Sequence, residues 1–301
     1  MGEQPYQKHI KPGAQMNRQK RVAAIHDISG FGRCSLTVAL PIISACGVET
    51  AVMPTALLST HTGGIEGYSF LDLTGEMRKF IDHWASLNLE FDGIYSGYMG
   101  SEGQIHLVSE FISRFKKPGT LAVVDPAMAD NGKMYPGFDQ KFAGSMAGLC
   151  AMADVTVPNI TEAAFMLGME YREGPYDQSY ITSLLNGLRG MGAKNVILTG
   201  VHFDDRRLGA ACMDEQGGVS GCYADRVEGY FHGTGDVFAS VVTAAMVLGH
   251  SLQEAATAAV DFTQKAIATT KKLGCDVRFG VNFEQGLADL GAAIRLSAKP
   301  E

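Results

Sequence analysis

The sequence predicts an α/β fold, with a mostly parallel central sheet, helices on both faces and an antiparallel hairpin at one edge. From Arg21 onward, short apolar runs alternate with longer segments of helical periodicity, as in strands joined by crossover helices. Later in the chain, the runs Leu208–Asp214 and Gly218–Ala224 flank Glu215-Gln216-Gly217, a turn-forming segment that predicts the edge hairpin.

The remaining elements follow from the same alternation. The predicted parallel strands are Arg21–His26, Thr50–Leu57, Gly93–Ser96, Leu121–Asp125, Val155–Val157 and Asn195–Thr199. The helices predicted between them are Ser35–Cys46, Gly75–Leu87, Glu102–Phe115, Phe138–Met152, Thr161–Leu167 and Tyr180–Arg189. Three more helices close the chain, at Thr234–Leu248, Leu252–Leu273 and Phe283–Leu296. No internal repeat or interdomain linker interrupts the pattern, so residues 21–301 are interpreted as one domain.

Composition narrows the class of protein. The 301 residues are 46% hydrophobic and 19% charged, with a net charge of −7 and no basic run beyond the first twenty residues, which argues against a nucleic-acid surface. No stretch approaches the ~18 apolar residues of a membrane span. The six cysteines form no CxxC pair and are typical of a reducing compartment, so we expect a cytoplasmic protein.

The first twenty residues differ from the rest. Residues 1–20 are polar, include Pro5, Pro12 and Gly13, and lack the apolar core of a signal peptide. We expect them to form a poorly ordered N-terminal extension.

Polar or glycine residues stand at the ends of several predicted strands. These ends are His26-Asp27, Ser96-Gly97-Tyr98, Asp125-Pro126, Pro158-Asn159 and Thr199-Gly200. In open parallel sheets, ligands bind outside the carboxyl ends of the strands, so the repeated placement indicates a site. The alternative is that each polar residue only caps a strand-to-helix turn.

The segment His232-Gly233-Thr234-Gly235-Asp236 carries the strongest chemical signal. It opens a long helix of small residues, whose first-turn amides and dipole form an anion site that glycines let a phosphoryl group approach. Asp236 would then stand beside the anion, where its useful task is to accept the proton of an attacking hydroxyl. Alternatively, Asp236 is a first-turn acid that gains only ~0.3–1 kcal/mol from the helix dipole.

Other signatures are absent or incomplete. The chain has no GxxxxGK[ST] loop, no HxxxH or HExxH zinc spacing and no GxSxG elbow. Gly30-Phe31-Gly32-Arg33-Cys34-Ser35 is a partial dinucleotide fingerprint with serine in place of the third glycine, so these glycines are interpreted as a turn beside the first strand end.

Candidate oxygen ligands for Mg²⁺ are Asp125, Asp130 and Glu162. Asp125 ends an apolar strand, where an acid is costly unless it is paired or functional. Glu162 follows Asn159 and Thr161, and a helix-capping role explains it equally well.

Five segments, in the same order, resemble the pyridoxal kinase (pyridoxamine kinase) family of the ribokinase-like superfamily. Gly233-Thr234-Gly235-Asp236 is similar to its GTGD element, and the four other segments cover its remaining strand ends and its substrate loop. They are Ser59-Thr60-His61-Thr62-Gly63, Ser96-Gly97-Tyr98-Met99-Gly100-Ser101, Val124-Asp125-Pro126-Ala127-Met128 and Val157-Pro158-Asn159-Ile160-Thr161-Glu162. The resemblance spans about Arg21 to Thr270 and implies a ribokinase-like fold.

The resemblance also implies roles for particular residues. Asp236 would be the base for the 5′-hydroxymethyl group of the substrate, with Gly233, Thr234 and Gly235 binding the transferring phosphoryl group. The ATP phosphates and magnesium would be organised by Asp125, Asn159 and Glu162, with Asp130 a weaker candidate and Thr199 beside the nucleotide. Thr62 and Tyr98 would line the pyridine site, covered by the His61–Gly64 loop. The implied cofactors are ATP, Mg²⁺ and a monovalent cation such as K⁺, and the implied assembly is a homodimer.

Two positions depart from the family pattern. The first strand end usually reads Q-S-H, whereas here it reads His26-Asp27-Ile28, so Asp27 takes the place of a serine that meets the pyridine ring. Asp27 could contact the ring nitrogen or the phenol side, which leaves the preferred vitamer open. Bacterial relatives often carry a lysine where this chain has Thr199-Gly200, so one phosphate contact is missing or is supplied elsewhere.

Other readings remain open. A hydroxymethylpyrimidine kinase of the same superfamily usually carries cysteine at the position of Asp236 and a G-S-D-x-S-G-G-A-G opening that residues 26–34 do not match. An ATP-dependent NAD(P)HX dehydratase, a lyase of this fold, also uses a GTGD element. A non-catalytic regulator of B6 levels and other sugar or nucleoside kinases complete the alternatives.

Overall fold

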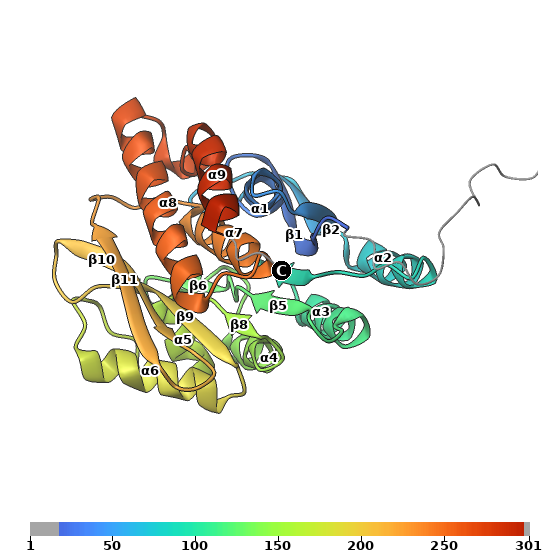
Figure 1. Cartoon of the computed structure of the whole chain (residues 1–301), viewed down its shortest axis with the longest axis horizontal. Helices are drawn as coiled ribbons and strands as arrows, with labels where there is room; N and C mark the ends of the chain where they lie inside the picture. The colour runs from blue at the N-terminus through green and yellow to red at the C-terminus, as the bar shows by residue number, and fades with distance from the viewer. Residues whose placement is uncertain (1–17, 298–301) are drawn as a thin grey trace, which may run out of the picture.

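The computed structural model describes residues 18–297, and its centre is a nine-stranded sheet (Figure 1). The strands lie in the order β11-β10-β9-β8-β5-β4-β1-β2-β3. Their bounds are β1 Arg21–Phe31, β2 Glu49–Thr60, β3 Phe70–Asp72, β4 Gly93–Ser96, β5 Leu121–Val124, β8 Val155–Thr156, β9 Asn195–Val201, β10 Arg207–Met213 and β11 Val219–Asp225. A separate small ribbon pairs β6 Ala129–Asp130 with β7 Lys133–Met134.

The six central strands, from β9 to β2, are all parallel to their neighbours. Their carboxyl ends therefore all point the same way, and the polar strand ends predicted from the sequence lie together there. The strands β3, β10 and β11 run antiparallel at the two sides of the sheet. The expected α/β fold, mostly parallel with an antiparallel edge hairpin, is confirmed.

Helices cover both faces of the sheet, and each face has its own hydrophobic core. One face is covered by α2 Thr74–Ser86, α3 Glu102–Phe115, α4 Gln140–Cys150, α5 Ile160–Leu167 and α6 Gln178–Gly190. The other is covered by α1 Leu36–Ala45, α7 Thr234–Val247, α8 Leu252–Leu273 and α9 Leu287–Ser297, with short 3₁₀ turns at Val277–Phe279 and Glu284–Gly286. Helix α7 is buried nearly all round, which explains why its sequence is small and apolar throughout.

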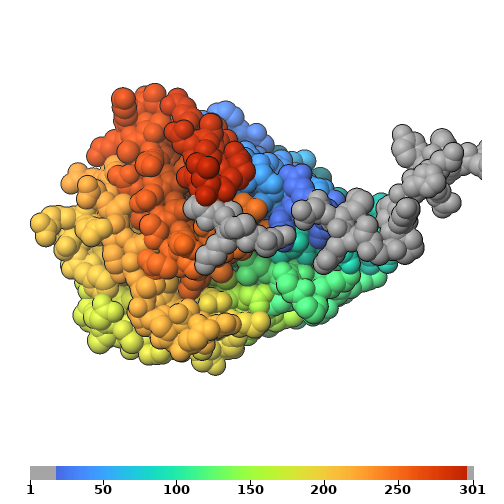
Figure 2. Space-filling model, viewed as in Figure 1, coloured from blue at the N-terminus to red at the C-terminus, as the bar shows by residue number. Residues whose placement is uncertain are grey.

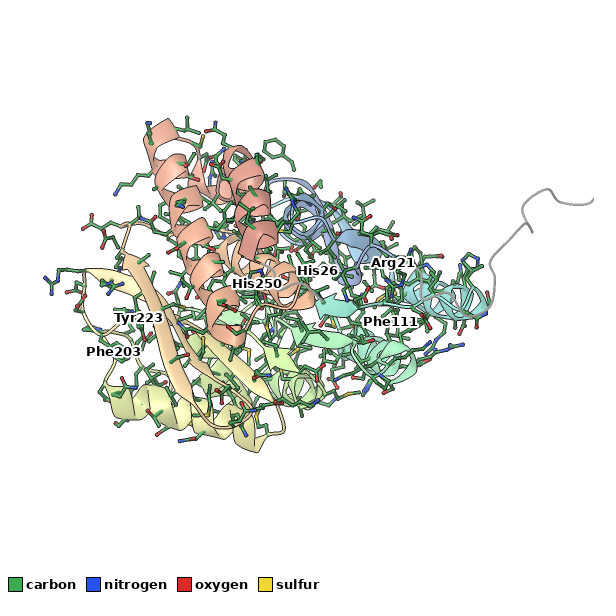
Figure 3. The ribbon with its side chains drawn as sticks, viewed as in Figure 1. Arg21, His26, Phe111, Phe203, Tyr223 and His250 are labelled. Carbon is green, nitrogen blue, oxygen red and sulfur yellow. The ribbon has the colours of Figure 1, made fainter. Side chains whose placement is uncertain are left out.

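The last helix of the chain packs beside the first one. Figure 2 shows the red C-terminal helix α9 beside the blue N-terminal part, and Arg295 of α9 donates to the carbonyl of Ala45 in α1 at 2.7 Å. At the other side of the sheet, Phe203 packs edge to face on Tyr223 of β11, with ring centroids 5.9 Å apart (Figure 3). No helix within residues 18–297 has the length and apolarity needed to cross a membrane.

The structure corrects several predicted boundaries. Strand β1 continues to Phe31 rather than ending at His26, so Gly30 lies in the strand and the turn begins at Gly32, whose φ is +104°. The short strands β3, β6 and β7 were not predicted, because two or three residues carry too little pattern to stand out. Residues 1–17 of the expected N-terminal extension lie outside the described residues, whereas Arg18 pairs with Asp92 at 2.6 Å.

Candidate active site

The start of α7 has the form expected of an anion site. Gly233 caps the helix with φ +74°, and a Cβ added there would lie 2.0 Å from the carbonyl oxygen of Arg33. Only glycine fits this contact, because every other residue would collide with that backbone. The first-turn amides of α7 lack partners within the helix and are directed at the space before it.

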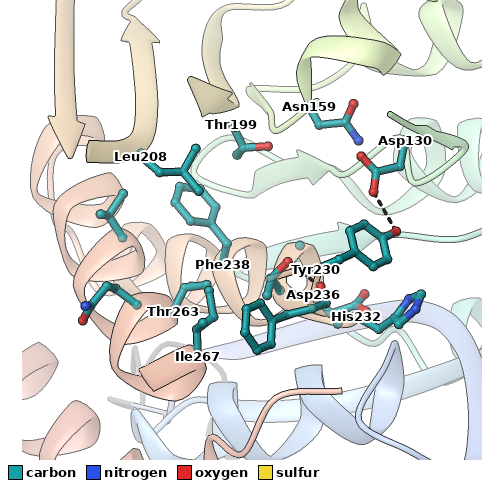
Figure 4. A pocket seen from close by; sticks show the side chains of 18 of the residues that line it. Asp130, Asn159, Thr199, Leu208, Tyr230, His232, Asp236, Phe238, Thr263 and Ile267 are labelled. Carbon is teal, nitrogen blue, oxygen red and sulfur yellow. Dashed lines mark hydrogen bonds between the residues drawn. The ribbon is translucent and has the colours of Figure 1, made fainter. Parts of the chain in front are cut away.

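That space is a cavity of about 330 Å³ at the carboxyl ends of the parallel strands (Figure 4). Nine of the predicted site residues line it, although they come from segments more than a hundred residues apart in sequence. They are Asp125, Asp130, Asn159, Glu162, Thr199, Gly233, Thr234, Gly235 and Asp236. Cavities of this size hold small-molecule ligands, so the sequence prediction and the geometry agree on the location.

Asp236 lies in the first turn of α7 and faces the cavity (Figure 4). Burial, together with the charges of Asp125 and Asp27, raises the pKa of Asp236 to about 8, although the Ser35 amide works in the opposite direction. A carboxylate whose pKa lies near neutrality can accept a proton from a substrate hydroxyl and still release it. The raised pKa makes Asp236 a stronger base than an exposed aspartate.

Asp125 and Glu162 form a second acidic pair in the wall of the cavity. Asp125 is 7% exposed and Glu162 is 2% exposed, and an added Cβ at Gly235 would lie 3.9 Å from Oδ2 of Asp125. Burial first, and then the Glu162 charge, raises the pKa of Asp125 well above its usual range. Burial likewise raises the pKa of Glu162 to about 7. Within residues 18–297, neither carboxylate has a salt bridge to lysine, arginine or histidine.

Glu162 also has the capping role that the sequence left open. Its Oε2 accepts the Asn159 amide at 2.9 Å, while the Glu162 amide donates to Oδ1 of Asn159 at 3.0 Å, which completes a capping box at the start of α5. Its Oε1 accepts the Met128 amide at 2.9 Å. Glu162 therefore fixes the loop after β5 against α5, and Asp125 has the freer carboxylate of the two.

Three other predicted nucleotide-side residues line the cavity with defined partners. Asn159 donates its Nδ2 to the Ala129 carbonyl at 2.8 Å, so its side chain holds the β6 loop in place. Thr199 donates its hydroxyl to the Pro158 carbonyl at 3.4 Å. Asp130 accepts the Tyr230 hydroxyl at 2.9 Å across the cavity (Figure 4).

Of the predicted substrate residues, Asp236 lines this cavity, whereas Asp27, Thr62 and Tyr98 are not among its lining residues. Asp27, in β1, is 4% exposed and close enough to Asp236 and Tyr98 for its charge to raise the pKa of both side chains. Burial is the larger cause for Tyr98, whose pKa rises to about 12. Thr62 belongs to the loop after β2, and that loop approaches the anion site because the His61 ring lies 5.0 Å from the His232 ring.

The structure adds residues that the sequence did not indicate. Arg226 lines the cavity from the segment before α7. Tyr230, from the same segment, and Thr263 and Ile267 of α8 line it as well (Figure 4). The position of Tyr230 just before His232 was a usable signal. No sequence signal pointed to the α8 residues, because they line the cavity only through the packing of α8 over it.

The arrangement fits a divalent cation held partly by the ligand. No three His, Cys, Asp or Glu side chains of residues 18–297 converge closely enough to hold a metal by themselves. Asp125 and Glu162 are nevertheless two buried hard oxygen donors without a basic partner, and Mg²⁺ commonly takes one or two carboxylates and completes its shell with water and phosphate oxygens.

Comparison with known proteins agrees with this geometry. The sequence model of the phosphomethylpyrimidine kinase family matches residues 39–280. The pyridoxine/pyridoxal/pyridoxamine kinase of Bordetella avium is 27% identical over 254 residues, which cover 80% of this chain and 82% of that protein. Both kinds of kinase are therefore represented among its relatives.

Solved structures show the same likeness. A Bacteroides thetaiotaomicron protein assigned to the phosphomethylpyrimidine kinases and solved with pyridoxal has a TM-score of 0.86 and 38% identity, covering 91% of this chain and 96% of that one. Pyridoxal kinase from Lactobacillus plantarum has a TM-score of 0.84 and 32% identity, covering 93% and 99%. The fold and site define a small-molecule kinase of the ribokinase-like superfamily. The chain belongs to its pyridoxal and phosphomethylpyrimidine kinase family.

Proposed function

We propose that the chain transfers the γ-phosphoryl group of ATP to the 5′-hydroxymethyl group of pyridoxal, pyridoxamine or pyridoxine, in the salvage of vitamin B6. The observation that carries the proposal is the position of Asp236, which lies in the first turn of a glycine-capped helix and lines a ligand-sized cavity. Burial there raises the pKa of its carboxyl. The B. thetaiotaomicron relative solved with pyridoxal supports the choice of acceptor.

In this proposal, each part of the site has one task. Asp236 accepts the proton of the acceptor hydroxyl as the hydroxyl attacks in line. The amides of Gly233, Thr234 and Gly235 bind the transferring phosphoryl group, because helix N-termini stabilise anions. The transition state is loose, so positioning and charge neutralisation account for most of the catalysis.

On the nucleotide side, Asp125 would hold Mg²⁺, with Glu162 behind it, and Asn159 and Thr199 would shape the wall around the phosphates. Magnesium, when bound, would neutralise phosphate charge next to an otherwise acidic wall. On the acceptor side, Thr62 and Tyr98 would line the pyridine site. A monovalent cation such as K⁺, a homodimer and a cytoplasmic location complete the proposal, and the resemblance and the free cysteines support them.

A second candidate is hydroxymethylpyrimidine kinase, which the matching family and its relatives favour. Against it stands Asp236, since those kinases usually carry cysteine at this position. Such a cysteine is not a carboxylate base, so the identity of this one residue separates the two readings.

The test is a panel of acceptors with Mg-ATP. Purified protein is incubated with pyridoxal, pyridoxamine, pyridoxine or hydroxymethylpyrimidine, with ADP release followed continuously and the phosphorylated product identified by mass spectrometry. We expect stoichiometric ADP and 5′-phosphorylated vitamer. Turnover of hydroxymethylpyrimidine alone would replace the proposal with the second candidate, and ADP release without any phosphorylated acceptor would refute both.

A further inference from the structure

We propose that the side chain of His232 positions the loop that follows β2, and so joins the acceptor side of the site to the phosphate-binding turn. The inference rests on the proposed function, because that function assigns Thr62 and its loop to the acceptor. His232 directly precedes Gly233, the residue that caps α7, so its side chain leaves the backbone next to the anion site.

His232 stands between two groups of strands. The cavity that it lines takes its wall residues from the ends of β5, β8 and β9 and from β10, α7 and α8. Residues 61–64 follow β2, which is the last parallel strand at the other side of the sheet. A contact between His232 and this loop therefore connects two parts of the site that the strands themselves keep apart.

The loop lies directly against the His232 ring. A Cβ built on Gly63 would lie 2.7 Å from Cε1 and 2.8 Å from Nδ1 of His232, so a side chain at position 63 would collide with the ring. The φ angle of Gly63 lies outside the left-handed region, so its backbone conformation is open to other residues. The closeness of the ring, rather than the backbone, is what requires glycine at this position.

The His232 ring is itself held from two sides. The Tyr230 ring meets it edge to face, with centroids 4.9 Å apart, and the His61 ring lies 5.0 Å away. Tyr230 is fixed in turn by its hydroxyl, which donates to Asp130 at 2.9 Å (Figure 4). The ring therefore cannot turn away from Gly63 without losing its contacts with both neighbouring rings.

The loop has an anchored start and an exposed tip. His61 is buried, its Nδ1 accepts the Gly63 amide at 3.1 Å, and its Nε2 bonds to the Arg278 carbonyl. Residues 66–70 are exposed. The His232 ring thus supports the loop where it leaves the protein interior. Without this support, the acceptor itself would have to order the loop on binding, which raises the KM for the acceptor.

The experiment is a double-mutant cycle with Gly63→Ala, His232→Ala and the combined variant. Steady-state kinetics with Mg-ATP and the vitamer that the wild type uses best give the KM for each substrate. Gly63→Ala should raise the acceptor KM about tenfold, because it forces the loop off the ring, and His232→Ala about three- to tenfold, because it removes the support. In the combined variant the collision is absent, so its acceptor KM should be close to that of His232→Ala instead of the product of the two effects. The KM for ATP should stay within about twofold throughout.

Two further measurements separate positioning from a loss of folding. Hydrogen exchange of the amides of residues 61–68 should be faster in both single variants than in the wild type. Thermal denaturation should show that all variants remain folded. Gly75→Ala is the matched control, because an added Cβ there meets nothing within 4 Å, and it should behave as the wild type in every measurement.

The outcomes separate this inference from the proposed function. If the two effects multiply in the combined variant, the ring does not contact position 63 and the inference is refuted. It is also refuted if His232→Ala leaves the acceptor KM unchanged, or raises the KM for ATP as much, since the ring would then act on the nucleotide. If the wild type phosphorylates no vitamer, the proposed function fails. Faster exchange in His232→Ala would then keep the contact with the loop, and unchanged exchange would exclude it.

Discussion

Buried carboxylates at the two ends of the parallel strands have opposite electrostatic surroundings. Asp154 immediately precedes β8, at the amino edge, and is 9% exposed. Its oxygens accept Lys194 and Lys116, each at 2.8 Å, and the Ala122 amide, also at 2.8 Å. Burial raises the pKa of Asp154, but the two lysines and the amide outweigh it, and the net pKa is lowered.

At the carboxyl ends of the strands, Asp125 is also buried and Asp236 is half-buried, but no lysine or arginine of residues 18–297 forms a salt bridge with them. Their pKa values are raised, Asp236 to about 8. Aspartate is thus paired with lysines at the amino ends of the strands and has no basic partner at their carboxyl ends. Carboxylates left without partners in a cavity are characteristic of sites whose counter-charges arrive with the ligand.

The largest effect that tests this comparison is expected from Asp236→Asn. Removing the base should lower turnover at least ~10²-fold, the usual contribution of a general base. The same change should raise the free energy of unfolding at pH 8 by about 1 kcal/mol, because it removes a carboxylate whose ionisation opposes folding. Steady-state ADP release and urea denaturation measure the two quantities. Undiminished turnover would disprove the assignment of Asp236.

The sequence predicted the ingredients of the site better than its geometry. The location of Gly233, Thr234 and Gly235 at a helix start could be predicted, because such a start is encoded within a few adjacent residues. The burial of the acidic residues and the effect of their charges on one another could not be predicted. Asp125 and Glu162 become neighbours only when α5 packs against the end of β5. The contact of Tyr230 with Asp130, a hundred residues apart, likewise depends on the complete fold.

Local pattern also decided which strands could be found. The parallel strands are buried runs of branched residues and stand out, whereas β3 is a three-residue strand whose side chains are exposed. Strand β1 was predicted too short because His26 and Asp27 look like a strand end. Both are buried in the middle of the strand, at the point where the register between β1 and β2 shifts.

A smaller effect is expected from pH. Because the pKa of Asp236 is about 8 and the base must be ionised to accept a proton, kcat/KM should rise about tenfold per pH unit below pH 8 and level off above it. The measurement uses both substrates well below saturation, so that it reports the free enzyme. The residual activity of Asp236→Asn serves as the control and should lose this dependence. A wild-type profile that is flat between pH 6 and 9 would contradict the assignment.

The smallest effect on catalysis is expected from Asp154→Asn, the matched change at the opposite edge. The variant loses two ion pairs to Lys116 and Lys194, so the free energy of unfolding should fall by about 1–3 kcal/mol at pH 7. The kcat/KM should stay within about twofold of the wild type, since Asp154 lies at the far edge of the sheet. The stability difference should disappear as the pH falls below 3.8 and through the lowered pKa of Asp154, because the wild-type carboxyl is then protonated too. Urea denaturation at pH 7 and pH 3, with activity at pH 7, gives all three values. A variant that kept its stability and lost its activity would contradict the structural role assigned to Asp154 at the amino ends of the strands.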